Sequence, residues 1–283
     1  MVSGDSMTRP IIALIYDFDK TLCTKNMQEY EFIPDTIGMQ PDEFWQQSRG
    51  LATLHGMDQI LAYMYLMVQT AAKKEVTVKR DEFVRLGTNI DFYAGVEQWF
   101  DKIANYGNDH GVDVEHYIIS SGLKEIIEGC SIYRHFRHVF ASEFMYDGYG
   151  RPCWPKVAVN YTTKTQFLFR IGKDVPDLSR DDEVNHYVAD SDRRISFANM
   201  IYIGDGLTDV PCMRLVKKEG GHSIAVYDGR RTQDVEDLLR YERVNHIYPA
   251  DYSVGSGLYE RVCDIIEQRA QIELLRVNAV RFN

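Results

Sequence analysis

A short apolar segment near the start of the chain, residues 11–16 (Ile-Ile-Ala-Leu-Ile-Tyr), ends at Asp17. An unbroken apolar run of this length, rich in isoleucine and bounded by polar residues, predicts a buried strand of a parallel sheet. Apolar runs of the same kind recur at residues 116–119, 199–203 and 222–227. The pattern therefore predicts several strands spread over most of the chain.

Segments with helical spacing lie between these strands. In residues 95–106 the apolar side chains recur every three or four positions, which predicts a helix with one buried face. Further helices are expected at residues 123–128, 163–171 and 256–276, and Asp147-Gly148-Tyr149-Gly150 predicts a hairpin turn. Strands that alternate with helices predict an α/β fold with a doubly wound parallel sheet.

The region from about residue 24 to residue 92 has a different pattern. Pro41-Asp42-Glu43 predicts the start of one helix, and residues 57–74 carry the apolar spacing of another. Runs of β-branched residues are few here. We therefore expect a separate helical unit, inserted after the first strand.

Composition limits the classes of partner. Apolar residues make up 45% of the 283 residues, charged residues make up 26%, and the formal net charge is −10. This charge argues against nucleic acid or an anionic membrane as the main partner, because both favour clustered Lys and Arg. A phosphorylated small molecule stays compatible, since one local cation can hold a phosphate. The sequence gives no indication of the oligomeric state.

Cysteine usage and the N-terminal residues predict a location. The five cysteines are scattered, without a close pair of the kind that binds zinc. Residues 1–9 are polar, without the apolar core of a signal peptide, and no apolar run is long enough to span a bilayer. We expect a cytoplasmic protein with reduced thiols.

Polar side chains follow three of the predicted strands. Asp17 and Asp19 follow the first, Ser120 the second, and Asp205 and Asp209 a later one. In an open parallel sheet, the ligand crevice lies outside the carboxyl ends of the strands. These side chains can therefore converge although they are far apart in sequence.

The first polar segment, Asp17-Phe18-Asp19-Lys20-Thr21, has two carboxylates two positions apart. One can attack phosphorus as a nucleophile, which divides a difficult hydrolysis into two easier steps. The other can protonate the leaving oxygen and then take a proton from water. An ordinary polar loop whose Asp19 or Thr21 caps a helix is the alternative for this segment taken alone.

Glycines flank a carboxylate in Gly204-Asp205-Gly206-Leu207-Thr208-Asp209. They allow a tight turn and the close approach of a hard cation such as Mg²⁺, which needs few protein oxygens. A glycine turn with Asp209 near a helix N-terminus is the alternative. Ser120 can bind phosphate oxygens together with helix N-terminal amides, or it can be a helix cap.

The joint pattern is specific. Residues 17–21, then Ile119-Ser120-Ser121-Gly122, then residues 204–209 occur in the order used by the haloacid dehalogenase-like hydrolase superfamily. Over nearly the whole chain the sequence resembles the phosphoserine-phosphatase-like branch of this superfamily. The resemblance implies a Rossmann-like catalytic core at residues 9–24 and 94–283, with a helical cap domain at residues 25–93.

The resemblance also implies roles for single residues. Asp17 matches the nucleophile and Asp19 the acid/base, and both belong to the implied Mg²⁺ site, Asp19 through its backbone carbonyl. Asp205 matches the metal carboxylate and Asp209 its supporting acid. Two hydroxyls match the phosphate-binding positions: Thr21 and Ser120.

A lysine is also required by the family, because carboxylates around a phosphate dianion need more positive charge than Mg²⁺ supplies. Lys164, which precedes Phe167-Leu168-Phe169, fits best. Lys156 is the second choice, and the position of Lys20 inside the first motif argues against it.

The sequence thus predicts a magnesium-dependent phosphatase acting on a small phosphorylated metabolite. Phosphoserine phosphatases carry a glutamate nine residues after the nucleophile, where this chain has Asn26, which argues against phosphoserine as substrate. A phosphoryl transferase or mutase with the same nucleophile, or a non-catalytic protein that binds a phosphorylated ligand, are the alternatives. Halide removal is disfavoured because it has no evident need for Asp19.

Overall fold

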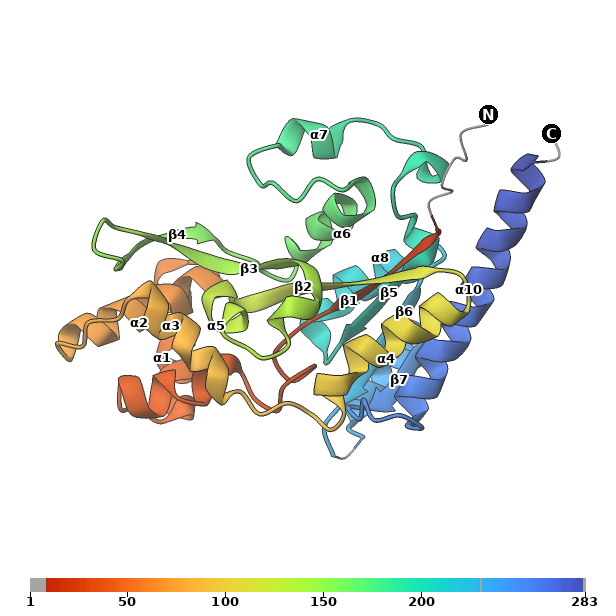
Figure 1. Ribbon diagram of the computed structural model, residues 1–283. Coiled ribbons are helices and arrows are strands. Elements are labelled where there is room, and N and C mark those ends of the chain that lie inside the picture. The colour runs from red at the N-terminus through yellow and green to blue at the C-terminus, as the bar shows by residue number, and fades with distance from the viewer. Residues whose placement is uncertain (1–8, 230, 282–283) are drawn as a thin grey trace.

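The computed structural model describes residues 9–229 and 231–281. Its centre is a seven-stranded sheet of order β4-β3-β2-β1-β5-β6-β7, in which β4 is antiparallel and the other pairs are parallel (Figure 1). The strands are β1 Ile11–Tyr16, β2 Asp113–Leu123, β3 Phe136–Tyr146, β4 Pro152–Val157, β5 Met200–Gly204, β6 His222–Tyr227 and β7 His246–Pro249. The central strand β1 lies between β2 and β5, which places three polar strand ends side by side.

Alternating side chains of β1 reach two separate apolar cores. Ile12 and Leu14 belong to the core on one face of the sheet, whereas Ala13 and Ile15 belong to the core on the other. The first core includes buried residues of α4 (Val96–Asp109) and α10 (Gly257–Arg281). The second includes residues of α6 (Lys164–Lys173), α8 (Val210–Lys218) and α9 (Gln233–Arg240). The predicted doubly wound α/β fold is confirmed.

A helical insertion follows β1 and forms the cap. Its helices are α1 (Pro41–His55), α2 (Gln59–Lys73) and α3 (Arg80–Leu86), grouped at one end of the molecule in Figure 1. Pro41 occupies the first turn of α1, and the Asp58 carboxylate caps α2 by accepting from the amides of Ile60 and Leu61. The buried face of the insertion joins the first core, with which it forms one continuous apolar cluster.

Several connections are short helical segments. These are α5 Lys124–Glu128, α7 Asp181–Asn185, and single turns at Met27–Glu29, Phe32–Thr36, Gly87–Asn89, Tyr133–His135, Asp190–Asp192, Phe197–Asn199 and Leu207–Asp209. The predicted hairpin forms between β3 and β4, where the Asp147 amide donates to the Arg151 carbonyl. No helix among residues 9–229 and 231–281 is long and apolar enough to cross a membrane. The polar start, residues 1–8, lies outside the described part.

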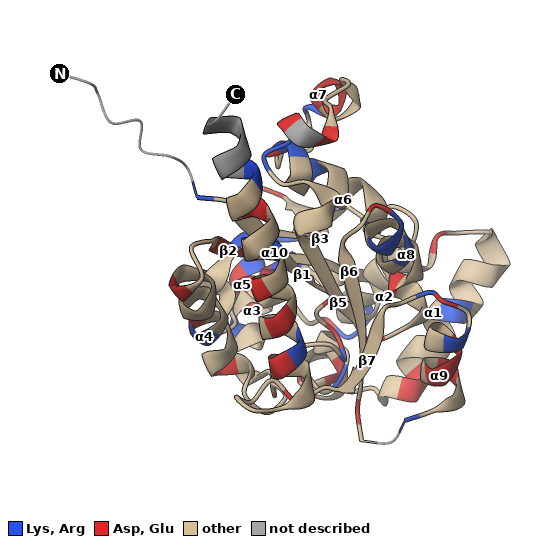
Figure 2. Ribbon diagram, turned by 90° about the vertical axis from the view of Figure 1, so that its right-hand side faces the viewer, with Lys and Arg blue, Asp and Glu red and all other residues tan. Residues whose placement is uncertain are grey.

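The surface of helix α10 carries both acidic and basic side chains. Acidic and basic segments alternate along α10 in Figure 2, and three ion pairs within this helix join Arg261, Arg269 and Arg276 to acids three or four positions away. The Arg269–Glu273 pair is largely buried, whereas the two pairs with exposed arginines, Arg261–Asp264 and Arg276–Glu273, contribute at most about 1 kcal/mol each. They keep the outer face of the helix polar.

Candidate active site

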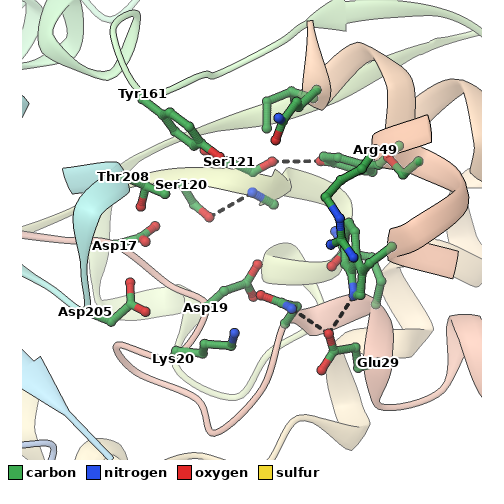
Figure 3. Close-up of a pocket in the computed structure, with 18 of the residues that line it drawn as sticks. Asp17, Asp19, Lys20, Glu29, Arg49, Ser120, Ser121, Tyr161, Asp205 and Thr208 are labelled. Carbon is green, nitrogen blue, oxygen red and sulfur yellow. Dashed lines mark hydrogen bonds between the residues drawn. The ribbon is translucent and has the colours of Figure 1, made fainter. Parts of the chain in front are cut away.

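The carboxyl ends of β2, β1 and β5 bring the predicted residues together. Asp17 directly follows β1, and its amide donates to the Ile203 carbonyl of β5 at 2.9 Å. Asp205 directly follows β5, and Ser120 lies within β2 near its carboxyl end. Figure 3 shows Asp17, Asp19, Ser120 and Asp205 around one cavity.

Three carboxylates form a compact acidic cluster. Asp17, Asp205 and Asp209 each place an oxygen within 4.8 Å of the others. The close approach of Asp209 depends on Gly204, where a Cβ atom would lie 2.6 Å from the Asp209 Oδ2. Glycine at position 204 therefore leaves room for the Asp209 side chain against the backbone of β5.

Lys164 lies beneath this cluster with its side chain fully buried. Its Nζ is 3.0 Å from the Asp17 Oδ1 and 2.8 Å from the Asp209 Oδ1. The Tyr202 hydroxyl donates to the same Asp209 oxygen at 2.7 Å. Burial lowers the pKa of Lys164, but the two carboxylates raise it by more, so the net shift is upward and the amine stays charged.

Lys164 balances only part of the negative charge of the three clustered carboxylates. Burial raises the pKa of Asp17 to about 7, Asp209 adds to the rise, and Lys164 opposes it. Burial and the charges of Asp209 and Asp17 raise the pKa of Asp205 to about 8. Oxygen donors with excess negative charge suit a hard divalent cation. The Asp17 and Asp205 carboxylates therefore fit a hard divalent cation such as Mg²⁺.

Asp19 is fixed beside the cluster. Its Oδ1 accepts from the Met27 amide at 2.8 Å. Burial raises its pKa well above the usual range, and the Asp17 charge adds to the rise. A group that keeps its proton near neutral pH can serve as a general acid.

The two predicted phosphate hydroxyls differ in position. Ser120 lines the cavity, and its Oγ accepts from the Gly122 amide at 3.0 Å. Thr21 is fully buried, does not line the cavity, and its Oγ1 has no hydrogen-bond partner among the described residues. The two candidate lysines differ as well, because Lys156 lies on the exposed hairpin and pairs with Glu143 at 2.8 Å.

The cavity has a volume of about 450 Å³ and is bounded by both the sheet and the insertion. From the insertion come Asn26, Gln28, Glu29, Asp42, Trp45, Ser48, Arg49, Gln59, Ile60 and Tyr63. The Trp45 indole donates to the Glu29 Oε1 at 2.6 Å, and the Asn26 amide donates to the same oxygen. Arg49 extends toward the cavity near Glu29 (Figure 3). The wall opposite the acidic cluster is therefore polar.

Sequence reasoning missed several of these residues. Tyr202 lies inside an apolar strand, where its hydroxyl gave no signal. Tyr161 lines the cavity from the turn before α6, whereas Ser121 and Thr208 line it from within the predicted motifs, where no role was assigned to them. Lys20 also lines it, with a left-handed backbone (φ 57°), as is common in tight turns near active sites.

Known proteins share this sequence pattern and fold. An uncharacterized protein of Borreliella burgdorferi is 27% identical over 89% of this chain and 97% of its own length. A phosphoserine phosphatase solved as a phospho-aspartyl intermediate analogue superposes with a TM-score of 0.54 at 14% identity, over 89% of this chain and 97% of that one. A HAD family hydrolase from Salmonella enterica serovar Typhi gives a TM-score of 0.54 at 15% identity, covering 86% of this chain and 69% of that one.

The sequence model of the haloacid dehalogenase-like hydrolases matches residues 14–214, which run from within the first strand through the insertion to the acidic cluster. The structural similarities above agree with this match in fold. The chain belongs to the haloacid dehalogenase-like hydrolase family.

Proposed function

We propose that this protein is a magnesium-dependent phosphatase that hydrolyses a small phosphomonoester through an aspartyl-phosphate intermediate. The observation that carries the proposal is the position of Asp17, whose carboxylate lies at the cavity floor, 3.0 Å from Lys164 and within the acidic cluster. This position, with a cation beside the carboxylate, supports a nucleophilic role for Asp17.

The two steps of the reaction use two carboxylates. In the first, an oxygen of Asp17 bonds to phosphorus, the bond from phosphorus to the leaving oxygen breaks, and Asp19 gives that oxygen its proton. In the second, Asp19 takes a proton from water, whose oxygen attacks phosphorus and releases Asp17 and inorganic phosphate. The raised pKa of Asp19 supports its first role, since the acid must begin protonated.

Charge stabilisation comes from the surrounding groups. Lys164 stays charged and orients Asp17, while Asp209 holds Lys164 in place. Ser120 is proposed to donate to the transferred phosphoryl group from the cavity wall. Mg²⁺, when held by Asp17, Asp205 and the Asp19 carbonyl, would neutralise phosphate oxygens. Thr21 stays a predicted phosphate ligand without a contact that supports it.

The division of labour between domains is part of the proposal. Residues 9–24 and 94–283 form the catalytic core, and residues 25–93 form the cap that selects the substrate. The insertion supplies about half of the cavity wall, which supports this division. The proposed substrate is a small phosphorylated metabolite, and the proposed location is the cytoplasm.

Phosphate release from a panel of phosphorylated metabolites, with Mg²⁺ present, tests the function. Wild type should release phosphate from at least one compound, Asp17→Asn should fall to background, and Asp19→Asn should lose most of the rate while still binding the compound. Transfer to a second acceptor without free phosphate would indicate a transferase instead. Equal background rates for wild type and Asp17→Asn over the whole panel would indicate a non-catalytic protein.

A further inference from the structure

A hydrogen bond joins the cap to the loop that carries the site lysine. The Asn160 side-chain amide donates from Nδ2 to the Asp58 Oδ2 at 2.9 Å, across 102 positions of sequence. Asp58 precedes α2 of the cap, and Asn160 lies four residues before Lys164. Both side chains are partly buried. We infer that this bond is a positioning contact that holds the cap closed over the cavity.

Each partner also caps backbone amides: Asp58 caps helix α2, and Asn160 caps the turn at residues 161–163 that precedes α6. The Asp58 Oδ1 accepts from the amides of Ile60 and Leu61, at 2.8 and 3.2 Å. The Asn160 Oδ1 accepts from the amides of Thr162 and Thr163, at 3.1 and 2.9 Å. The two caps therefore fix both side chains, and each has one remaining polar atom that faces the other.

The amide of Asn160 has only one orientation that satisfies these contacts. Its oxygen accepts from backbone amides, so its nitrogen must be the atom that faces Asp58. The Asp58 carboxylate divides its oxygens in the same way, one for the helix and one for Asn160. An Asp–Asn pair thus provides two caps and a bridge, because one residue supplies the donor and the other only acceptors.

The bridge lies where two walls of the cavity meet. Gln59 and Ile60, which directly follow Asp58, line the cavity from the cap side. Tyr161, which directly follows Asn160, lines it from the core side. A second contact from α2 to the core lies nearby, where the Tyr63 hydroxyl donates to the Ser121 carbonyl at 2.7 Å. Loss of the Asp58–Asn160 bond would therefore loosen this junction and leave the Tyr63–Ser121 contact to hold it.

Lys164 does not depend on the bridge for its own position. The Lys164 amide donates to the Asn160 carbonyl at 3.0 Å, but its Nζ is held independently by Asp17 and Asp209. Breaking the bridge should therefore weaken substrate binding more than it slows the chemical step. This kinetic part of the inference rests on the proposed phosphatase function, whereas the closure itself does not.

Exchanging the two residues tests the bridge separately from the caps. Asn160→Asp keeps the capping oxygen but places a second carboxylate against Asp58. The double variant Asp58→Asn, Asn160→Asp restores a donor and an acceptor in reversed positions, keeps both caps and keeps the net charge of the wild type. Asn185→Asp, an exposed change on α7, is the control for added charge.

Hydrogen exchange of the amides in residues 57–64 reports closure without any substrate. Asn160→Asp should speed this exchange about ten-fold or more. The double variant should return to within about two-fold of wild type, and Asn185→Asp should match wild type. With para-nitrophenyl phosphate, Asn160→Asp should raise KM about ten-fold while kcat changes by less than about three-fold, and the double variant should reverse this.

Exchange in the double variant as fast as in Asn160→Asp would overturn the inference, and so would exchange at the wild-type rate in Asn160→Asp. If Asn160→Asp does not fold, Asp58→Asn replaces it, because asparagine is an equally good cap and its Nδ2 would face the Asn160 Nδ2, which breaks the bridge. Absence of phosphate release by the wild type would disprove the proposed function, and the exchange comparison would still decide whether the bridge closes the cap.

Discussion

The Nζ of Lys164 lies 3.0 Å from the Oδ1 of Asp17, and neither side chain has appreciable contact with solvent. A buried amine against a buried carboxylate is expensive to separate, because removal of either partner leaves an uncompensated charge. The contact therefore serves folding and the proposed chemistry together.

Lys164→Met should lower the free energy of unfolding by about 3–5 kcal/mol, because Asp17 and Asp209 lose the cation between them. Denaturant titration of the metal-free protein measures this change. Lys156→Met is the matched control, since that exposed pair with Glu143 should contribute no more than about 1 kcal/mol. Equal effects of the two substitutions would show that Lys164 contributes no more to the free energy of unfolding than an exposed lysine does.

Asp205→Asn should weaken Mg²⁺ binding by about ten-fold or more, because a cation that takes few protein ligands loses a charged one. Calorimetric titration with Mg²⁺ measures the affinity, and chelation should abolish turnover in the wild type. Asp42→Asn provides the comparison, since Asp42 also lines the cavity but is outside the acidic cluster. The metal assignment would be wrong if both variants bound Mg²⁺ like the wild type.

His116 should make the protein less stable in acid. Burial lowers the pKa of His116 to about 3, and the ring is held by the Tyr16 hydroxyl at 3.0 Å. The unfolded chain, with a histidine pKa of about 6.5, binds the proton more readily, so this contribution is fully present above about pH 6.5. It is lost as pH falls from there toward 3, by up to about 1.4 kcal/mol per pH unit.

Denaturant titrations between pH 7.5 and 4.5 check this slope. His116→Gln should remove the histidine part of it, whereas replacement of the exposed His55 by Gln should leave the wild-type slope. Identical slopes in all three proteins would mean that His116 is protonated in the folded state or gains access to water.

Gly204→Ala should destabilise the protein by about 1–3 kcal/mol, because the new methyl group would overlap Asp209. Asp209 has little freedom to move, since Lys164 and Tyr202 both hold it. Gly206→Ala is the control, because its Cβ would meet open space and its backbone is extended. Thermal melts of the two variants should differ by several degrees. Equal melting temperatures would mean that the chain around Gly204 relaxes without cost.

The apolar runs and their polar ends were enough to predict the fold class. The strand at residues 222–227 and the hairpin at Asp147–Gly150 were predicted where they form. By contrast, β7 and α9 were missed, because a four-residue strand with histidine and tyrosine and an eight-residue helix are too short for a local pattern to identify. Local pattern identifies an element only when the element is long or uniformly apolar.

The site shows the same limit. Motif order indicated Asp17, Asp19, Ser120, Asp205 and Asp209, because strand ends gather at one edge of a parallel sheet. Tyr202 and the cap residue Gln59 could not be predicted, since their positions depend on tertiary packing rather than on neighbours in sequence. Residues that reach the site only through tertiary packing can be identified from the structure but not from the sequence pattern.

The sheet order also has a consequence for how the chain is made. Strand β1 pairs with β5, so Ala13 leaves the ribosome long before its partner Met200 has been synthesised. Until then one edge of the central strand is unpaired, and Asp17 lacks Asp205 and Asp209, which follow β5 in the chain. A nascent chain arrested before β5 should therefore be a target for chaperones.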